Sequence, residues 1–432
     1  MMDWKTLYKQ RLTDADTALK SVQNGHRIMI PFAAGQPKST MDALGRRIDE
    51  LDHVEIAQLV TVTKDLPYLD ENRVDKVGFT SSYAGVRTRE NLNKGTGAFA
   101  PVFLKDFTRM YSVEYDPDVV LIQVSPPDRH GNVSLGVSVD HNKASAEHAR
   151  IVIAEVNEQM PRCHGDCFLH VSQLTHIVEY NHPVLETPRP DITEVERKIG
   201  ENVASLIRDG DCMQLGIGSI PDATLLFLKD KKHLGVHTEM FSDGIVELVE
   251  AGVIDNSRKT LHKGKIISSF LMGTRRLYDF VDDNPDVWMF PCNYTNDPFI
   301  IAQNDNMVSV NSSVEIDLMG QAASESIGAY QYSGVGGQVD FIRGALAAKN
   351  GRAILALPST AGKDHEVSKI VARLGAGTPV TTTRNDVDFV ATEYGVASLR
   401  FKTLHERAEQ LINIAHPNFR EALRTEARIM NW

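Results

Sequence analysis

Four glutamates follow short apolar runs that are typical of strands, so each could present a carboxylate at a strand end. They are Glu239 in "HTEMFSDG", Glu315 in "SVEID", Glu325 in "ASESIG" and Glu393 in "TEYG". A carboxylate held in this way can act as a nucleophile or as a general base, whereas one that alternates outward along a strand is simply solvated. Spacing alone gives Glu239 only a modest lead over the other three.

Three glycine-rich loops could bring backbone N–H groups close to a ligand. "GIGSIP" (216–221) follows a predicted strand and precedes a predicted helix, where N–H groups can face an anion. "SGVGGQVDFIRGA" (333–345) has a glycine density that permits close backbone approach, and "SPPDRHGNVSLG" (125–136) is a rigid proline turn. None is a dinucleotide fingerprint or a P-loop, since Pro221 replaces the last glycine of the former and no GK[ST] is present. Plain turn-making is the alternative for all three.

Other catalytic constellations are missing from the sequence. No G-x-S-x-G elbow and no H-E-x-x-H pair occurs, so neither a serine hydrolase nor a zinc protease is indicated. Cys163 and Cys167, with His164 and His170 nearby, make zinc conceivable, but free thiols in a reducing compartment are the preferred interpretation. We therefore expect no metal.

Short apolar runs alternate with segments of helical period along the whole chain, which predicts an α/β fold. The runs are rich in Val and Ile and barely alternate, as in strands covered on both faces of a parallel sheet. The predicted strands are 27–33, 54–62, 118–125 and 150–156 in the first half, and 212–218, 235–240, 265–273, 307–317, 352–358 and 387–395 in the second.

A proline-rich linker at 179–200 separates two halves, which we predict to be domains 1–190 and 191–432. The halves resemble each other weakly: "HRIMIPFAAGQP" (26–37) and "DCMQLGIGSIP" (211–221) both read strand, glycine, proline and then helix. Two diverged copies of one unit would explain this, although two α/β halves can also align by chance. Clefts between domains commonly hold active sites.

Composition excludes some partners. The 432 residues carry a formal net charge of −11, which argues against a nucleic-acid binder. No run approaches the roughly 18 apolar residues of a membrane span, and the first residues lack the apolar core of a signal peptide. We expect a cytoplasmic protein that contacts neither nucleic acid nor membrane.

Several of these stretches together resemble the acetyl-CoA hydrolase/transferase family, and most closely its 4-hydroxybutyrate and butyryl-CoA:acetate CoA-transferases. The resemblance covers essentially the whole chain and is carried by "VSPPDRHG" (124–131), "LGIGSIPDA" (215–223), "DKKHLGVHTEMFSDG" (230–244), "KGKIISSFLMGTRRLYDF" (263–280), "SGVGGQVDFIRGA" (333–345), "VTTTRNDVDFVATEYG" (380–395) and "LINIAHPNFR" (411–420). It implies two tandem α/β domains of the NagB/RpiA/CoA-transferase-like type, with the active site in the cleft between them.

The resemblance also implies roles for individual residues. The catalytic glutamate of the family occupies the position of Glu239, and the backbone N–H of Gly337 and the side chain of Asn296 would bind the oxyanion. An Asx turn ahead of Pro298 is an equal alternative for Asn296. The residues that would line the CoA and substrate site are Gly216, Ile217, Gly218, Gly334, Val335, Gly336, Gln338, Asp340 and Phe341.

The activity so implied moves coenzyme A from a short-chain acyl-CoA, such as 4-hydroxybutyryl-CoA or butyryl-CoA, to acetate through a glutamyl-CoA thioester. Coenzyme A is then a substrate, no cofactor is needed, and relatives suggest a homodimer or a larger homo-oligomer. Three alternatives stay open. They are an acyl-CoA hydrolase, a succinyl-CoA or propionyl-CoA:acetate CoA-transferase, and a catalytically silent CoA-binding or sugar-sensing module.

Overall fold

The chain folds into two compact units. The computed structural model describes residues 3–63, 66–216 and 218–432. The first unit comprises Met1–Thr187 and Ile267–Thr295, and the second comprises Pro188–Ile266 and Asn296–Trp432.

A single boundary at residue 190 would place every later residue in the second domain. The segment Ile267–Thr295 instead belongs to the first unit. One reason is strand pairing, because β16 (Val287–Met289) lies parallel to β8 (His164–Gly165) of the first unit. The segment therefore returns to the first unit after the chain has begun the second.

In its described residues the first unit contains a seven-stranded parallel sheet in the order β10-β7-β5-β1-β2-β3-β4. The strands are β1 (Arg27–Met29), β2 (Val54–Ala57), β3 (Val77–Ser81), β4 (Ala98–Phe99), β5 (Val119–Val124), β7 (Ile151–Val156) and β10 (His176–Glu179).

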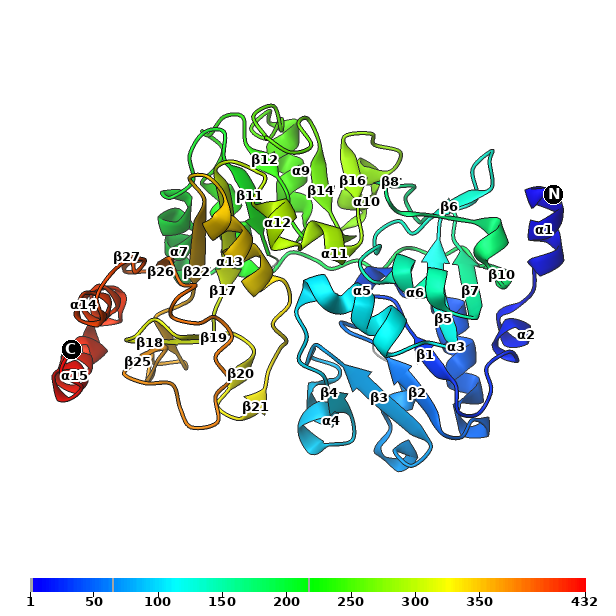
Figure 1. Ribbon diagram of the computed structural model, residues 1–432, viewed down its shortest axis with the longest axis horizontal. Coiled ribbons are helices and arrows are strands. Elements are labelled where there is room, and N and C mark those ends of the chain that lie inside the picture. Colours follow the sequence, from blue (N-terminus) through cyan, green and yellow to red (C-terminus); the bar gives the residue numbers. More distant parts are fainter. Residues whose placement is uncertain (1–2, 64–65, 217) are drawn as a thin grey trace. The chain divides into compact units, whose positions relative to one another are not determined.

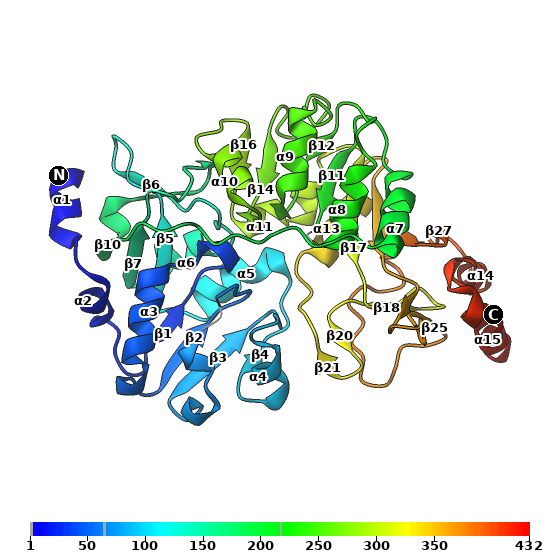
Figure 2. The same cartoon turned by 180° about the vertical axis from the view of Figure 1, so that it is seen from behind.

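Helices cover both faces of this sheet. Helix α3 (Lys38–Arg47) crosses the face seen in Figure 2, and α6 (Asn142–His148) lies on the face seen in Figure 1. Leu44 of α3 packs in one apolar core with Ile56 and Leu121 of the sheet. Coverage on both faces explains why the strands read as continuous apolar runs.

The described part of the second unit contains a six-stranded sheet in the order β12-β11-β17-β22-β26-β27, in which only the β26–β27 pair is antiparallel. The strands are β11 (Cys212–Leu215), β12 (Gly235–Val236), β17 (Met307–Ser312), β22 (Arg352–Ala356), β26 (Phe389–Thr392) and β27 (Gly395–Ser398).

This sheet is also sandwiched by helices. Helices α7, α8 and α9 lie on the face seen in Figure 2, and α12 and α13 lie on the face seen in Figure 1. Helices α14 and α15 follow β27, and Leu411 of α14 packs with Leu355 and Val390 of the sheet. The helices are α7 (Glu194–Ala204), α8 (Ser219–Leu226), α9 (Asp243–Glu250), α12 (Pro298–Ile301), α13 (Gln338–Ala347), α14 (Leu404–Ile414) and α15 (Pro417–Ile429).

The two sheets are similar in topology. In the first unit the chain goes from β1 through β2, β3 and β4 on one side and then fills β5, β7 and β10 on the other. In the second unit it goes from β11 to β12 and then fills β17, β22 and β26 in the same way. The prediction of two similar α/β units is confirmed, and β11 is a point where the strand order reverses, at which α/β sheets commonly bind ligands.

The predicted strands exist but are shorter than expected. The run 307–317 forms β17 and then β18 (Glu315–Asp317), because Ser313 turns its hydroxyl to the carbonyl oxygen of Ala323 at 2.9 Å. Helix α7 begins at Glu194, where Thr193 and Glu196 form a capping box. No helix in the described ranges is long and apolar enough to cross a bilayer.

Candidate active site

Glu239 lies just beyond β12, at the carboxyl edge of the second sheet. The N–H of His237 donates to the carbonyl oxygen of Met213 at 3.0 Å, which continues the parallel ladder past the end of β12. The hydroxyl of Thr238 donates to the carbonyl oxygens of Leu215 at 3.2 Å and Met240 at 2.8 Å. These bonds fix the backbone before and after Glu239, whose side chain stays partly exposed.

Two donors meet the carboxylate of Glu239. Asn296 Nδ2 donates to Glu239 Oε2 at 2.9 Å, and the backbone N–H of Gly337 donates to the same carboxylate. Asn296 is fully buried, so its amide is held in place by the surrounding protein. The structure therefore brings together the three residues that the sequence singled out for catalysis.

The turn ahead of Pro298 does not use the side chain of Asn296. Asp297 caps α12 instead, and accepts a hydrogen bond from the N–H of Phe299 at 2.8 Å. Asn296 Oδ1 meets no hydrogen-bond partner in the described part of the chain. One end of this amide serves Glu239, and the other is an unused buried acceptor.

Only glycine fits at position 337. A Cβ built there would collide with Glu239 Oε2 and with Asn296 Nδ2. The backbone of Gly337 has an ordinary φ of −94°, so available space and not conformation requires the glycine. The missing side chain is what lets the main-chain N–H approach the carboxylate.

Gly337 is also the N-cap of α13, so the positive end of the helix dipole is directed toward Glu239. The loop before the helix is anchored from within, because Gln338 Nε2 donates to Ser324 Oγ at 2.8 Å and to Thr382 Oγ1 at 2.9 Å. A rigid loop of this kind can present a preorganised donor to a developing oxyanion.

The other predicted residues of this loop divide by burial. Gly334, Gln338, Asp340 and Phe341 are buried, while Val335 and Gly336 are partly exposed, and Gly336 has a φ of +55°. Coenzyme A binding by this loop stays a prediction, for which Val335 and Gly336 are the two of these residues that are partly exposed to solvent.

The loop after β11 ends on a glycine with a positive φ. Gly218 is the N-cap of α8 with a φ of +118°, a conformation that only glycine adopts without cost. A Cβ on Gly216 or Gly218 would meet nothing within 4 Å, so space is open beside this loop. Ile217, predicted with them, lies outside the described residues.

Burial raises the pKa of Glu239 to about 7, although the hydrogen bonds from Asn296 and Gly337 act to lower it. The group is thus divided between acid and carboxylate near neutral pH. A carboxylate that is incompletely solvated and aimed by two donors is a better nucleophile than a surface glutamate.

The three rival glutamates have other surroundings. Glu393 accepts hydrogen bonds from Ser359 N at 2.9 Å and Ser359 Oγ at 2.6 Å, which is a loop-fixing role. Burial raises the pKa of Glu315 and of Glu325, and the hydroxyl of Thr381 donates to Glu325 Oε1 at 3.1 Å. The combination of a side-chain amide and a helix N-cap N–H singles out Glu239.

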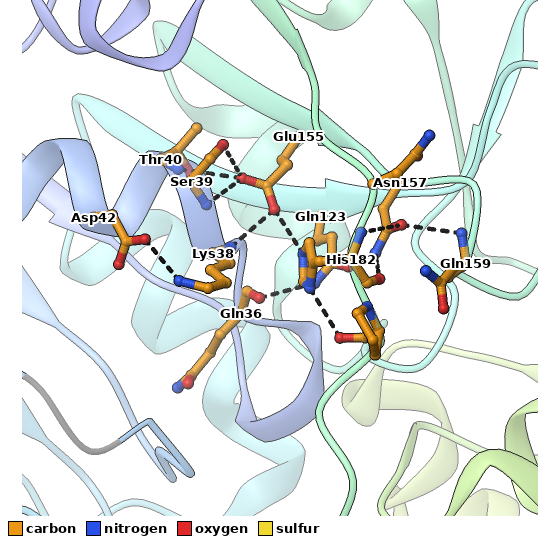
Figure 3. A network of polar contacts seen from close by, with 12 residues as sticks. Gln36, Lys38, Ser39, Thr40, Asp42, Gln123, Glu155, Asn157, Gln159 and His182 are labelled. Carbon is orange, nitrogen blue, oxygen red and sulfur yellow. Dashed lines mark hydrogen bonds and ion pairs between the residues drawn. The ribbon is translucent and has the colours of Figure 1, made fainter.

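A fifth carboxylate, buried in the first unit, was not predicted from the sequence. Glu155 in β7 is fully buried and accepts hydrogen bonds from the backbone N–H groups of Lys38, Ser39 and Thr40 at 2.7–3.2 Å (Figure 3). His182 Nε2 lies 3.0 Å from Glu155 Oε1, the oxygen that also accepts from the N–H of Lys38. Glu155 is therefore saturated by the first turn of α3, and no signal along the chain links these residues, which are separated by more than 100 positions.

Cys163 and Cys167, considered for zinc, are buried, and the two histidines near them in sequence contact other residues. His164 Nε2 lies 2.9 Å from Asp283 Oδ1, and His170 Nδ1 lies 2.8 Å from Ser172 Oγ. Among the described residues no group of three or more His, Cys, Asp or Glu side chains is placed to hold a metal ion.

Comparison with known proteins adds independent information. Residues 1–186 match the N-terminal domain of acetyl-CoA hydrolase/transferase and residues 273–427 its C-terminal domain. The chain is 52% identical to a 4-hydroxybutyrate coenzyme A transferase of Clostridium kluyveri, over 98% of this chain and 99% of that protein. It is 36% identical to a butyryl-CoA:acetate CoA-transferase of Anaerostipes caccae, over 99% and 98%.

Among solved structures, the 4-hydroxybutyrate CoA-transferase of Porphyromonas gingivalis superposes with a TM-score of 0.86 at 40% identity. The match covers 99% of this chain and 100% of that one. Both domain models and full-length relatives thus agree with the predicted resemblance. The chain belongs to the acetyl-CoA hydrolase/transferase family.

Proposed function

We propose that this enzyme transfers coenzyme A between a short-chain acyl-CoA, of the 4-hydroxybutyryl or butyryl type, and acetate. The observation that carries the mechanism is the Glu239 carboxylate held by Asn296 Nδ2 at 2.9 Å and by the N–H of Gly337. The acids are those named for its relatives from C. kluyveri and A. caccae.

In the first half-reaction a Glu239 oxygen attacks the thioester carbonyl carbon of the acyl-CoA. Collapse of the tetrahedral intermediate breaks the C–S bond and leaves a mixed anhydride and a CoA thiolate. The thiolate then attacks the glutamyl carbonyl of the anhydride. This step releases the first acid as its carboxylate and leaves a Glu239–CoA thioester.

The second half-reaction repeats these steps with acetate. An acetate oxygen attacks the glutamyl thioester, the thiolate leaves, and it returns to the acetyl carbonyl to form acetyl-CoA and free Glu239. Every step forms an oxyanion, for which Asn296 Nδ2 and the N–H of Gly337 are the available donors. No proton is gained or lost overall, so the scheme needs neither a general base nor a cofactor.

Water must be kept from the anhydride, because hydrolysis would discard the energy of the thioester. Placement of the site in a cleft between the two domains would serve this purpose and stays a prediction. The same holds for assembly into a homodimer or larger homo-oligomer, which sedimentation of the purified chain would measure, and for a cytoplasmic location.

The decisive experiment is borohydride reduction after incubation with butyryl-CoA and without acetate. The glutamyl thioester should be reduced to the alcohol, so peptide mass spectrometry should find the modification at position 239 together with loss of activity. Glu239→Gln serves as the control and should give no alcohol at that position. An unmodified Glu239 peptide with activity intact would refute the covalent scheme.

A kinetic comparison separates transfer from hydrolysis. A transferase requires acetate and gives parallel lines in double-reciprocal plots, since one acid leaves before the other binds. A hydrolase releases thiol from acyl-CoA alone. Thiol release at an unchanged rate without acetate would assign the chain to the hydrolase branch of its family.

A further inference from the structure

The second unit has a pocket of about 580 Å³ whose lining residues include none of Glu239, Asn296 and Gly337. Leu346 and Ala347, in the last turn of α13, form one wall, and Asp386, just before β26, lies in another. These are the amino ends of the strands, whereas Glu239 follows the carboxyl end of β12. Helix α13 has ten residues and so extends over about 15 Å between Gly337 and this pocket.

Four cationic side chains and one carboxylate line the pocket. They are Arg343, Arg400, Lys402 and Arg407, with Asp386 as the acid. The excess of positive charge is local, because the chain as a whole carries a formal charge of −11. A concave basic surface on an acidic protein attracts anions of matching size.

Part of this charge has a structural role. Arg343 Nη2 lies 3.2 Å from Asp386 Oδ2, and Arg400 Nη2 reaches the carbonyl oxygen of Leu346 at 3.5 Å, near the C-terminus of α13. Cations at that end of a helix are favoured by its dipole. These two arginines alone would not indicate a ligand.

Arg407 also bonds to the main chain, whereas Lys402 is not explained in this way. Arg407 is buried, and its Nη1 donates to the carbonyl oxygens of Met319 at 3.1 Å and Arg384 at 2.7 Å, not to a carboxylate. Burial and the charge of Arg384 lower the pKa of Arg407. Lys402 Nζ comes no closer than 3.8 Å to Glu406, whose carboxylate is engaged in capping α14.

An aromatic ring projects at the edge of the same pocket. Phe401 is 91% exposed and has a φ of +63°, which is rare for a bulky residue. The guanidinium carbon of Arg400 lies 4.8 Å from its ring centroid. The chain holds Phe401 there through bonds on both sides, from Leu399 N to Asp388 O at 2.7 Å and from Lys402 N to Leu399 O at 3.2 Å.

We propose that this pocket, formed by Arg343, Asp386, Arg400, Phe401, Lys402 and Arg407, is a second, non-catalytic site that binds a nucleoside di- or triphosphate. The cations meet the phosphates, and the Phe401 ring with the Arg400 guanidinium offers a flat platform for the base. Residues held in rare backbone conformations, as Phe401 is, cluster at functional and ligand-binding sites. A volume of 580 Å³ falls within the roughly 300–1,000 Å³ of small-molecule pockets.

The test is calorimetric titration of the full chain with ADP. Coenzyme A is left out, because its own adenosine diphosphate moiety would compete with ADP for the same pocket. ADP should bind, and Lys402→Glu should weaken it by roughly tenfold or more, since the change replaces attraction by repulsion. The matched control is Lys229→Glu, the same charge change at an exposed lysine elsewhere in the second unit.

The base is tested by Phe401→Ala and by inorganic pyrophosphate. Loss of the ring should weaken ADP about fivefold or more, as for other base–aromatic stacks, and leave pyrophosphate unchanged. Because Phe401 is so exposed, this variant should unfold at the temperature of the wild type. Pyrophosphate should bind more weakly than ADP to the unmodified protein.

Three results would overturn the assignment. They are the absence of ADP binding, equal weakening by Lys402→Glu and Lys229→Glu, and equal affinity for ADP and pyrophosphate with no effect of Phe401→Ala. If the absence of ADP binding came with a change in sedimentation of the Phe401→Ala protein, this face would be a contact between copies of the chain.

Discussion

Asn296 donates from Nδ2 to Glu239 Oε2 at 2.9 Å, while its own Oδ1 is buried without a partner in the described residues. A buried amide that leaves one end unsatisfied carries a cost of about 1–3 kcal/mol. The orientation that keeps Nδ2 toward Glu239 therefore gives up stability for a donor at the reacting carboxylate.

Asn296→Ala should lower kcat by roughly 100- to 1,000-fold, because one donor to each oxyanion is lost. The KM for acyl-CoA should change much less, since this donor acts mainly on charge that develops in the transition state. Steady-state kinetics checks this, with Asn350→Ala, an exposed asparagine on the loop after α13, as the control. An equal loss in both variants would mean that Asn296 has no special role.

Gly337→Ala should abolish most activity, since the new methyl group collides with Glu239 Oε2 and Asn296 Nδ2. We expect a loss beyond 100-fold, because displacement of a reacting group by about 1 Å costs that much. Gly375→Ala is the matched control, as its Cβ would meet only Thr378 Oγ1 at 3.5 Å with no positive φ. A fully active Gly337→Ala enzyme would show that this N–H is not needed.

The pKa of Glu239, raised by burial to about 7, predicts that kcat/KM rises with pH and levels off above that value. Protonated Glu239 cannot attack, so activity is lost as the pH falls through 7. Asn296→Ala should move the midpoint upward, because the hydrogen bond it removes lowers the pKa. A profile flat between pH 5.5 and 8.5 would contradict the assignment of this group as the nucleophile.

The same shift has a consequence for stability with a definite sign. The folded-state pKa lies above the unfolded one, so ionisation of Glu239 makes the folded state less stable as the pH rises from about 4.3 toward 7. Glu239→Gln should therefore stabilise the protein at pH 8, on the order of 1–3 kcal/mol after allowance for partial exposure, and have little effect at pH 4.5. Urea unfolding at both pH values measures this, and a destabilised variant at pH 8 would contradict it.

A buried ion pair joins the start of β22 to the residue before β11 in the second sheet. Arg352 Nη2, at the start of β22, lies 2.6 Å from Asp211 Oδ1, and both side chains are less than 10% exposed. Asp211→Asn should cost about 3–5 kcal/mol of unfolding free energy, because it leaves the buried Arg352 charge uncompensated.

The control for this change is Asp42→Asn, which breaks the exposed pair of Lys38 and Asp42 and should cost at most about 1 kcal/mol. Denaturant titration of both variants gives the comparison. Equal costs would show that burial of Arg352 and Asp211 is without energetic effect.

The architecture could be predicted from the sequence because strands and helices depend on the pattern of residues that are close together in the chain. Apolar runs of Val and Ile marked the strands, since this pattern depends on near neighbours. Strand ends were placed too late, as at Ser313, because bonds to distant segments decide where a ladder stops.

The site was less accessible to that reasoning. Glu239, Asn296 and Gly337 are up to 98 positions apart, and only family resemblance selected them from several glutamates and loops. The basic pocket was missed for the same reason, since Arg343 is far from Phe401 and Lys402 in sequence, and the exposed ring has no periodic signal. Chemistry assembled by topology leaves no local pattern to read.

Glu155 has a further consequence for an enzyme that works among free carboxylic acids. The N–H groups at the start of α3 would suit any such acid, but Glu155 is tethered beside them and fills the site. A tethered group competes at an effective concentration of millimolar or more. The side chain of Glu155 thereby keeps acetate or butyrate from binding at the start of α3, away from the reacting carboxylate.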